Sequence, residues 1–552
     1  MLTISHYGES SILATDENND VIDDLADKLI TNSYPFITNV TSAGKALVVY
    51  FDPLVTDQEI IAALLLDLQK APPLTARAPV TMDITLVLDG IDLNEVLLKT
   101  KYSLKEFANE IYGKSYQVGH LGFTPGFLYL NGLNPALNIH RRPTPRVNVP
   151  GGSVAIGGPY LGIYGRDAPG GWHIIGTTPA ILFDISKQSP MLLRSRDQIR
   201  FIRKDRYEPH FANDNRDALS LHHEAARPDP PQWQHSRMIS ASGQVVFQDL
   251  GRFRYAHLGV GHSGAMDQIA YSLANEVLRN DHNATSIEIA FGHLSLEMLT
   301  NTYVAIAGAQ CEVTIDGRSV GHNRVHGVLK GQRIDIRVAN SNVYAYLATQ
   351  GGFAAPLILG STSRDTLSHI GPPPLQSNDF LGATPHGRPP FDTIKYESGK
   401  NNPQLSVTRG PNISSFSPST YEWFFATQFE VSPTSSRSGI RLKSSVANPI
   451  NSTPLTSSQP VTPGAIQLPT NGDPIVIGRD NPTTGGYPII GCLSRSGLSR
   501  LSQLPPGSRV SFYPQDIQIQ RDQESLFWAK QYKMLHGYRP VDEIIAINSS
   551  FR

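Results

Sequence analysis

The sequence is poor in cysteine and carries almost no net charge. Its 552 residues include only two cysteines, Cys311 and Cys492, which are far apart and have no CxxC partner, and the formal net charge is -1. Two isolated thiols indicate a reducing compartment and exclude a disulfide scaffold. A balanced charge without a clustered basic stripe gives no sign of binding to nucleic acid or to a membrane surface.

Long hydrophobic runs and targeting segments are also missing. The longest apolar stretch, Ile60 to Leu66, is far shorter than the roughly 20 residues that a membrane-spanning helix needs. Residues Met1 to Ser10 carry neither a basic region nor an apolar core, so they show no signal peptide. We therefore expect a cytoplasmic protein with no membrane partner.

Several motifs of nucleotide, metal and acyl chemistry are absent as well. No GxxxxGK[ST] phosphate loop occurs, and no GxGxxG opens a helix after a strand. The run Gly261-His262-Ser263-Gly264 is not a GxSxG elbow, because its second glycine comes one residue early. His257 and His262, and likewise His222 and His223, lack a third ligand at zinc spacing. No Ala-Met-Lys-Met tetrapeptide of a biotin carrier is present.

Glycine and proline, in contrast, are abundant, with 46 and 41 copies. These residues punctuate turns, so the composition predicts many short strands and a mainly β fold with α+β parts. Apolar spacing predicts a strand over 46–51. It also predicts helices over residues 21–30, 56–70, 103–112, 269–278 and 524–535.

Shifts in composition divide the chain into segments. A small α/β domain is followed by a Gly/Pro-rich barrel or sandwich, a linker without apolar periodicity, two strand-rich units and a helical tail. The predicted boundaries, in that order, are 1–80, 81–206, 207–237, 238–400, 401–516 and 517–552.

Two parts of the chain resemble each other. VPGGSVAI (149–156) precedes GGWHIIG (170–176), and VTPGAIQL (461–468) precedes GGYPIIG (485–491). The order is the same, and a three-residue change in loop length accounts for the different spacing. Chance is one explanation, because Gly-Gly-aromatic turns before strands are common. The other is a duplicated barrel whose glycine-lined turns let backbone N–H groups approach a ligand.

Longer motifs closely resemble a known enzyme family. The first set resembles allophanate hydrolase subunit 1, also called the B component of 5-oxoprolinase or the KipI family: GFTPGFLYLNGL (122–133), RRPTPRVNVPGGSVAIGG (141–158) and GIYGRDAPGGWHIIGTTP (162–179). The second resembles allophanate hydrolase subunit 2, also called the C component of 5-oxoprolinase or KipA: FQDLGRFRYAHLGVGHSGAMDQ (247–268), TQGGF (349–353), LGSTSRDT (359–366), VTPGAIQLPTNGDPIVIGRDNPTTGGYPIIG (461–491) and LPPGSRVSF (504–512). The pair is also similar to the carboxyltransferase region of urea carboxylase.

The resemblance implies a fusion of the B and C components, built from cyclophilin-like β-barrels with a small N-terminal α/β domain. It implies part of an ATP-hydrolysing 5-oxoprolinase, a hydrolase acting on a cyclic amide, which opens 5-oxoproline to glutamate. The implied partner is a separate protein of the LamB/YcsF type, the A component of 5-oxoprolinase, and the implied cofactors are ATP and Mg²⁺. Phosphorylation of the carbonyl oxygen would make the lactam a better electrophile. The oligomeric state, including a homo-oligomer, stays open.

Two other functions compete with this one. A carboxyltransferase-type component would act with a biotin carrier on urea or a similar amide. A non-catalytic kinase-inhibitor-like protein would only bind its partner. The fusion of both halves in one chain favours an enzyme of fixed stoichiometry over a free inhibitor.

Site residues are predicted from the polar, Gly-flanked loops of these motifs. Arg142, Arg146 and Arg252 would supply positive charge, because guanidinium groups suit phosphate and carboxylate. Carboxylates of Asp249, Asp267 and Asp480 would act as a base or hold Mg²⁺, which prefers oxygen ligands. The other candidates orient or protonate the substrate, cradle it or wall the pocket: His120, His173, Tyr164, Trp172, Gln467, Thr483, Thr484, Gly485, Gly486 and Tyr487.

Plain structural roles compete with these assignments. Loop Arg-Asp pairs often only brace a turn, and aromatic residues beside Gly-Gly are usually core. The chain also departs from the family at residues 435–439, where Ser436 stands in place of an aspartate in a Ser-Asp-Arg-Met-Gly-type run. A charged role at that position is therefore in doubt. No residue is assigned as a metal ligand.

Overall fold

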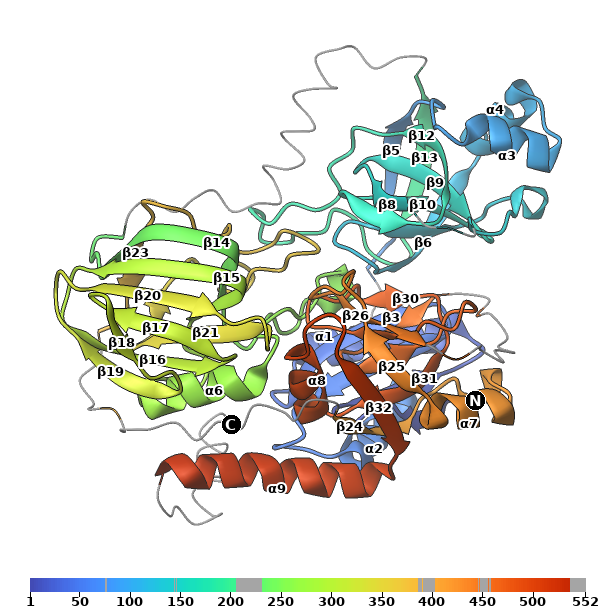
Figure 1. Ribbon diagram of the computed structural model, residues 1–552. Helices are drawn as coiled ribbons and strands as arrows, with labels where there is room; N and C mark the ends of the chain where they lie inside the picture. The colour runs from blue at the N-terminus through green and yellow to red at the C-terminus, as the bar shows by residue number, and fades with distance from the viewer. Residues whose placement is uncertain are drawn as a thin grey trace.

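The computed structural model describes residues 1–74, 77–142, 144, 146–204, 231–385, 390, 403–444, 446, 455 and 458–536. Most of the predicted linker, the boundary near residue 400 and the end of the tail lie outside these residues. The fold is mainly β with few helices, as the sequence predicts, and contains a closed seven-stranded barrel (Figure 1). The cyclophilin-like character of the barrels stays a prediction.

The N-terminal module is one antiparallel sheet covered by two helices. Its strands run in the order β1-β2-β4-β3, and the helices bury Leu25 and Ile61 against the sheet. Asp57 caps α2 by accepting from the N–H of Ile60, which satisfies a free donor of the first turn. The small N-terminal domain and the strand over 46–51 are thus confirmed. The elements are β1 (Thr3–His6), β2 (Ser11–Thr15), α1 (Asn19–Asn32), β3 (Ile37–Ala43), β4 (Ala46–Phe51) and α2 (Gln58–Lys70).

A seven-stranded sheet follows, which we call barrel 1. Its order is β12-β9-β10-β7-β6-β13-β5, and its core includes Phe107, Val118 and Ile156. A two-stranded ribbon, β8 and β11, lies beside it. The elements are β5 (Thr81–Leu86), α3 (Leu93–Thr100), α4 (Leu104–Tyr112), β6 (Ser115–Leu121), β7 (Leu128–Asn131), β8 (Arg146–Val149), β9 (Ser153–Gly157), β10 (Tyr160–Ile163), β11 (Ala168–Gly170), β12 (His173–Thr177) and β13 (Gln198–Arg203).

A larger sheet of ten strands occupies the middle of the chain and stands apart from the barrels in Figure 1. Helix α6, with Asp267 as its N-cap, packs on this sheet. The elements are β14 (Ser236–Gln248), α6 (Gln268–Val277), β15 (Ser286–Met298), β16 (Thr302–Gly308), β17 (Cys311–Ile315), β18 (Arg318–Val320), β19 (Arg324–Val328), β20 (Arg333–Val338), β21 (Tyr344–Thr349), β22 (Phe353–Ala354) and β23 (Phe380–Ala383).

The last globular part is a closed barrel, which we call barrel 2. Its order is β24-β31-β28-β29-β26-β25-β32, with the ribbon β27 and β30 beside it. The elements are β24 (Gln404–Arg409), α7 (Pro418–Ala426), β25 (Gln428–Val431), β26 (Gly439–Ser444), β27 (Gln459–Pro460), β28 (Ala465–Gln467), β29 (Ile475–Ile477), β30 (Thr484–Gly485), β31 (Ile489–Leu493), α8 (Arg495–Ser502), β32 (Arg509–Pro514) and α9 (Ile517–His536).

Barrels 1 and 2 have the same topology, which supports duplication over chance as the source of the sequence echo. Along the chain, the strands of the two sheets pair in the same order, and both sheets include a parallel pair, β5 with β13 and β24 with β32. A ladder between β24 and β31 closes barrel 2, whereas in barrel 1 the isolated bridge between Val87 and Thr177 stands at this place. The echo segments form adjacent antiparallel strands in both barrels, each with a register shift. Gly152 and Gly464 occupy equivalent turns with φ of 80° and 86°, a conformation that favours glycine.

The N-terminal module packs on barrel 2, which is far away in the sequence. Val48 of the module is buried with Ile477 and Ile489 of the barrel in one apolar cluster. The hydroxyl of Tyr50 donates to the carbonyl of Val461 at 2.8 Å across this junction. Residues of the two ends of the chain thus form one structural unit (Figure 1).

Helix α9 lies along the body, and its buried Trp528 packs into the core cluster shared by α6 and barrel 2. Among the described residues, no helix combines the length and apolar character that crossing a membrane requires. Helices α3, α7 and α8 were not predicted from the sequence. They are short, and α7 and α8 lie in a segment whose composition indicates strands.

Candidate functional site

A cavity of about 200 Å³ lies where the N-terminal module, the loops before α6, barrel 2 and α9 meet. Its wall draws on every one of these parts. Glu9 comes from the turn between β1 and β2, His262 from the loop before α6, Arg479 and Thr483 from the loop after β29, and Trp528 from α9. We call this space the junction cavity.

Several polar atoms around the junction cavity are buried and have no hydrogen-bond partner among the described residues. They are Oε2 of Glu9, Nε and Nη2 of Arg479, Oδ1 of Asn481 and Oγ1 of Thr483. A buried polar atom without a partner costs roughly 1–3 kcal/mol, so such atoms are rare and require an explanation. Their concentration around one cavity is typical of a site that a small polar ligand completes.

Glu9 is held in the wall by the start of α8. Its Oε1 accepts the backbone N–H of Arg495 at 2.7 Å, and its side chain is 5% exposed. Burial and the nearby Glu524 carboxylate raise the pKa of Glu9 to about 8. At neutral pH this carboxyl is therefore mostly protonated.

Arg479 and His262 lie on another part of the wall. Burial, together with the neighbouring Arg495, lowers the pKa of the Arg479 guanidinium to about 9. Burial also lowers the pKa of His262 to about 4, so this ring is neutral. Its Nε2 donates to the carbonyl of Leu250 at 2.9 Å, which leaves Nδ1 as an acceptor.

Arg142, Arg146 and His173, predicted as catalytic, gather at the start of α3 in barrel 1. Nη2 of Arg146 donates to Oδ1 of Asp92 at 2.6 Å, and Nη1 of Arg142 donates to the same oxygen at 3.2 Å. His173 donates from Nε2 to the His140 carbonyl at 3.1 Å. The structure brings these three residues together, and their catalytic role stays a prediction.

Asp249 and Arg252 belong to a buried polar network beside the ten-stranded sheet. Oδ1 of Asp249 accepts from the hydroxyls of Ser361 and Ser363 at 2.6 and 2.5 Å, and Oδ2 accepts the N–H of Thr362 at 2.8 Å. Arg252 is 1% exposed and donates to backbone carbonyls, including that of Ser363. Both side chains brace the loop 358–363, and neither lines the junction cavity.

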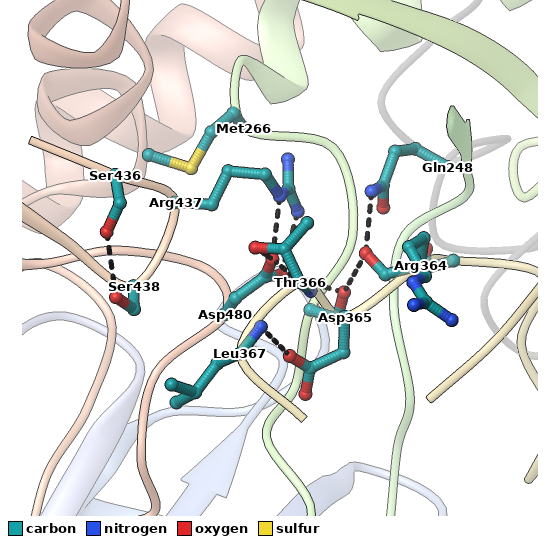
Figure 2. A network of polar contacts seen from close by, with 12 residues as sticks. Gln248, Met266, Arg364, Asp365, Thr366, Leu367, Ser436, Arg437, Ser438 and Asp480 are labelled. Carbon is teal, nitrogen blue, oxygen red and sulfur yellow. Dashed lines mark hydrogen bonds and ion pairs between the residues drawn. The ribbon is translucent and has the colours of Figure 1, made fainter. Parts of the chain in front are cut away.

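Asp480 forms a bidentate ion pair with Arg437, as Figure 2 shows. Nε of Arg437 lies 2.8 Å from Oδ2 of Asp480, and Nη2 lies 2.9 Å from Oδ1. Burial alone would raise the pKa of Asp480, and the guanidinium reverses this, so that the pKa lies below its usual value. Nη1 of Arg437 pairs with Glu288 of the middle sheet at 2.5 Å. This network ties the middle part of the chain to barrel 2.

The motif 435–439 acquires a clear role from this geometry. The hydroxyl of Ser436 lies 2.8 Å from that of Ser438, and its backbone pairs with that of Gly439 (Figure 2). The next residue, Arg437, carries the ion pairs. Asp267 is also embedded: its Oδ1 caps α6 and its Oδ2 accepts from Gln503 at 2.8 Å.

The loop 483–487 lies between the two barrels. The N–H of Thr483 donates to the carbonyl of Phe123 at 3.1 Å, and Oγ1 of Thr484 lies 3.3 Å from the hydroxyl of Tyr129. Gln467 covers Gly485, where an added Cβ would lie 2.4 Å from Nε2 of that glutamine. An added Cβ on Gly486 would lie 2.4 Å from Nη1 of Arg141. Tyr487 is 39% exposed. The loop thus allows close approach, and Thr483 lines the junction cavity.

His120, Tyr164 and Trp172 form part of an aromatic cluster that is separate from the main core of barrel 1. The ring of His120 stacks on Tyr129 with 4.0 Å between centroids, and Phe127 contacts both Tyr164 and Trp172. Burial lowers the pKa of His120 to about 3, so its ring is neutral. The aromatic rings of this cluster pack against one another.

The residues predicted to hold Mg²⁺ do not suit that ion. The oxygens of Asp249, Asp267 and Asp480 are buried and already accept hydrogen bonds or an ion pair. Asp92, Glu95 and His173 bring possible ligand atoms within 4.8 Å of one another, but Arg142 and Arg146 neutralise Asp92. The junction cavity is below the roughly 300–1,000 Å³ of pockets for drug-sized ligands, so it suits a small metabolite better than ATP.

Glu9, Arg479 and Asn481 line the junction cavity but are not among the site residues predicted from the sequence. For Arg479 a pattern was available, because Gly-Arg-Asp occurs between the echo segments in both halves, at 165–167 and 478–480. For Glu9 there was none, since an acidic residue in a short turn is typical of any exposed loop.

Comparison with known proteins identifies related chains for both parts. Residues 2–193 match the model of the carboxyltransferase domain, subdomains C and D, and residues 258–514 match that of subdomains A and B. The chain is 30% identical over 301 residues to the C component of 5-oxoprolinase from Escherichia coli K12, which covers 53% of this chain and 96% of that protein. It is 44% identical over 113 residues to the B component of 5-oxoprolinase from Escherichia coli O157:H7, covering 20% of this chain and 52% of that one.

Two further comparisons concern the architecture and a second enzyme. The crystal structure of TTHA0988 superposes with a TM-score of 0.81 at 27% identity, covering 93% of this chain and 99% of that chain. The urea amidolyase of Saccharomyces cerevisiae is 28% identical over 299 residues, which are 49% of this chain and 16% of that enzyme. Because the TTHA0988 chain matches both parts of this chain, the two parts are also fused in that solved protein.

Proposed function

Because the chain belongs to the carboxyltransferase-domain family of the 5-oxoprolinase B and C components, we propose that it is the fused B and C component of an ATP-dependent 5-oxoprolinase. In this proposal it acts with a separate A component of the LamB/YcsF type and opens the lactam of 5-oxoproline to glutamate.

One observation carries the proposal. The junction cavity is walled by the part that resembles the B component, through Glu9, and by the part that resembles the C component, through His262, Arg479 and Thr483. Neither part alone encloses this space. A site shared between two components gives a physical reason for fusing them in one chain.

The chemistry of the proposal follows from the stability of an amide. Resonance makes the lactam carbonyl a poor electrophile, and phosphorylation of its oxygen would make the carbon open to attack by water. Catalysis of such a transfer depends mostly on positioning and on neutralising negative charge. We assign to this chain the binding and orientation of the lactam, and we assign none of its residues to ATP or Mg²⁺.

The test is a reconstitution. The purified chain is mixed with a LamB/YcsF-type A component, ATP, Mg²⁺ and 5-oxoproline, and both glutamate and ADP are measured. We expect both products only when all components are present. A complete mixture that forms no glutamate and leaves ATP intact would contradict the proposal.

A second candidate is a carboxyltransferase component acting on urea or a similar amide. It is supported by the similarity to urea amidolyase, which aligns with 49% of this chain at 28% identity. This function needs a carboxylated biotin carrier in place of the A component. Formation of carboxylated urea from such a carrier, with no ATP present, would favour it over the first candidate.

A further inference from the structure

Arg479 lines the junction cavity. Nε and Nη2 lie on the same side of a guanidinium group, and both are buried without a hydrogen-bond partner among the described residues. This pair of parallel N–H groups matches the two oxygens of a carboxylate. The residue is only 6% exposed, so the solvent does not compensate for the missing partner.

The cavity supplies no anion that pairs with Arg479. Glu9 lines the same space, but no ion pair within 4.0 Å joins the two side chains in the described structure. The carboxyl of Glu9 is anchored by the N–H of Arg495 and is mostly protonated at neutral pH. Arg479 and Arg495 lie in the wall together with the carboxyls of Glu9 and Asp52, and no ion pair joins Arg479 to either carboxyl in the described structure. The free edge of Arg479 therefore favours a ligand that brings its own carboxylate.

Two neighbours of Arg479 complement an amide. Nδ2 of Asn481 donates to the carbonyl of Pro482 at 2.9 Å, so Oδ1 is the atom without a partner among the described residues and can accept an N–H. The hydroxyl of Thr483 also has no hydrogen-bond partner among the described residues, and it can donate to a carbonyl. An acceptor and a donor are the two groups that the N–H and the C=O of an amide require.

We propose that the junction cavity selects a small molecule carrying both a carboxylate and an amide, with Arg479 binding the carboxylate and Asn481 and Thr483 facing the amide. The identity of this ligand as a lactam acid rests on the proposed function. Urea and other simple amides lack the carboxylate, so they leave Arg479 buried and unpaired. A site whose polar groups stay unpaired rejects the smaller analogue strongly.

The test measures binding to the full chain by calorimetry, without ATP or the A component. The probes are 5-oxoproline, 2-pyrrolidinone, which is the same lactam without its carboxylate, and urea. We expect 5-oxoproline to bind at least about 100-fold more tightly than the other two. Equal affinity for 5-oxoproline and 2-pyrrolidinone, or no binding of 5-oxoproline at millimolar concentration, would overturn the proposal.

Variants locate the carboxylate contact. Arg479→Gln is expected to weaken 5-oxoproline binding by roughly 100-fold and to leave 2-pyrrolidinone unchanged. The matched control is Arg441→Gln, on an exposed position of β26, which should leave both affinities unchanged. Should Arg479→Gln fail to fold, Thr483→Val takes its place and is expected to weaken both lactams by about tenfold. Unchanged affinity in the folded variant would overturn the proposal.

The outcomes separate this proposal from the function above. In one outcome the reconstituted enzyme forms glutamate while the Arg479→Gln variant binds 5-oxoproline with unchanged affinity. This outcome would support the oxoprolinase function and contradict the role of Arg479. Selective binding of 5-oxoproline without any turnover beside the A component would support the carboxylate site and remove the oxoprolinase function.

Discussion

Replacing Arg437 by glutamine tests whether its buried ion pairs hold the middle part of the chain to barrel 2. The side chain is 1% exposed, and its partners Asp480 and Glu288 are both 0% exposed. Nη2 also donates to the carbonyl of Gly264 at 2.6 Å. Glutamine keeps a polar group at the position but removes the charge, so two buried carboxylates lose their counter-ion.

The expected magnitude follows from what the carboxylates retain. Asp480 keeps its hydrogen bonds from Ser263 and Thr366, and Glu288 keeps those from Met266 and Tyr346. Removing one partner of a buried pair typically costs about 3–5 kcal/mol, because the remaining charge stays buried. We expect a loss in that range at pH 7. The loss should shrink at pH 5, because the two carboxyls then take up protons.

The assay is urea unfolding of the full chain, followed by circular dichroism. The matched control is Arg237→Gln, whose pair with Glu297 at 2.7 Å is 40% and 32% exposed and is expected to contribute less than about 1 kcal/mol. Adding Asp480→Asn to Arg437→Gln should recover part of the stability, because one uncompensated carboxylate disappears. Equal losses for Arg437→Gln and Arg237→Gln would refute the reasoning.

Three further predictions concern the junction between the ends of the chain. Burial raises the pKa of Glu9 from 4.5 to about 8, so the folded state holds a proton that the unfolded state releases, and stability should fall as pH rises from about 4.5 to 8. In urea unfolding at several pH values, Glu9→Gln should reduce the dependence of the unfolding free energy on pH. An unchanged pH dependence would contradict the raised pKa of Glu9. Tyr50→Phe removes the hydrogen bond to Val461 and should cost about 1 kcal/mol in urea unfolding; no change would mean that water replaces this bond. Trp528→Ala removes the indole that stacks under Arg495 at 4.0 Å, so the amides of residues 517–529 should exchange hydrogen faster, and unchanged rates would show that α9 is held elsewhere.

The sequence predicted elements well where one pattern was strong. Helix α4 begins after Ser103, which forms a capping box with Glu106, and the prediction over 103–112 agrees with it to within a residue. Helices α3, α7 and α8 were not predicted. Helix α8 is a serine-rich segment with few apolar residues, so it shows no helical apolar pattern. Its burial depends on contacts with α6, which lies more than 200 residues earlier in the chain.

For the candidate site, the sequence indicated which residue types could bind a ligand, but it did not indicate which of them lie around one cavity. Arg142 and Asp249 are polar loop residues of the kind that binds ligands, and the structure pairs both with nearby groups of the protein. Glu9 and Arg479 are 470 positions apart, and nothing local in the sequence connects them. A role for either could be inferred only after the fold had placed both in the wall of one cavity.

The sequence by itself determined the mainly β class, the echo between its two halves and the resemblance to the two oxoprolinase components, because these follow from local periodicity, turn residues and long ordered motifs. The shared strand order was needed to favour duplication over chance as the source of the echo. Only the tertiary structure decided which polar side chains face a cavity and which compensate one another. Burial and hydrogen bonding depend on partners that are distant along the chain. Arg437 and Arg479 are both buried arginines, yet the first is fully paired within the protein, whereas Nε and Nη2 of the second have no partner among the described residues.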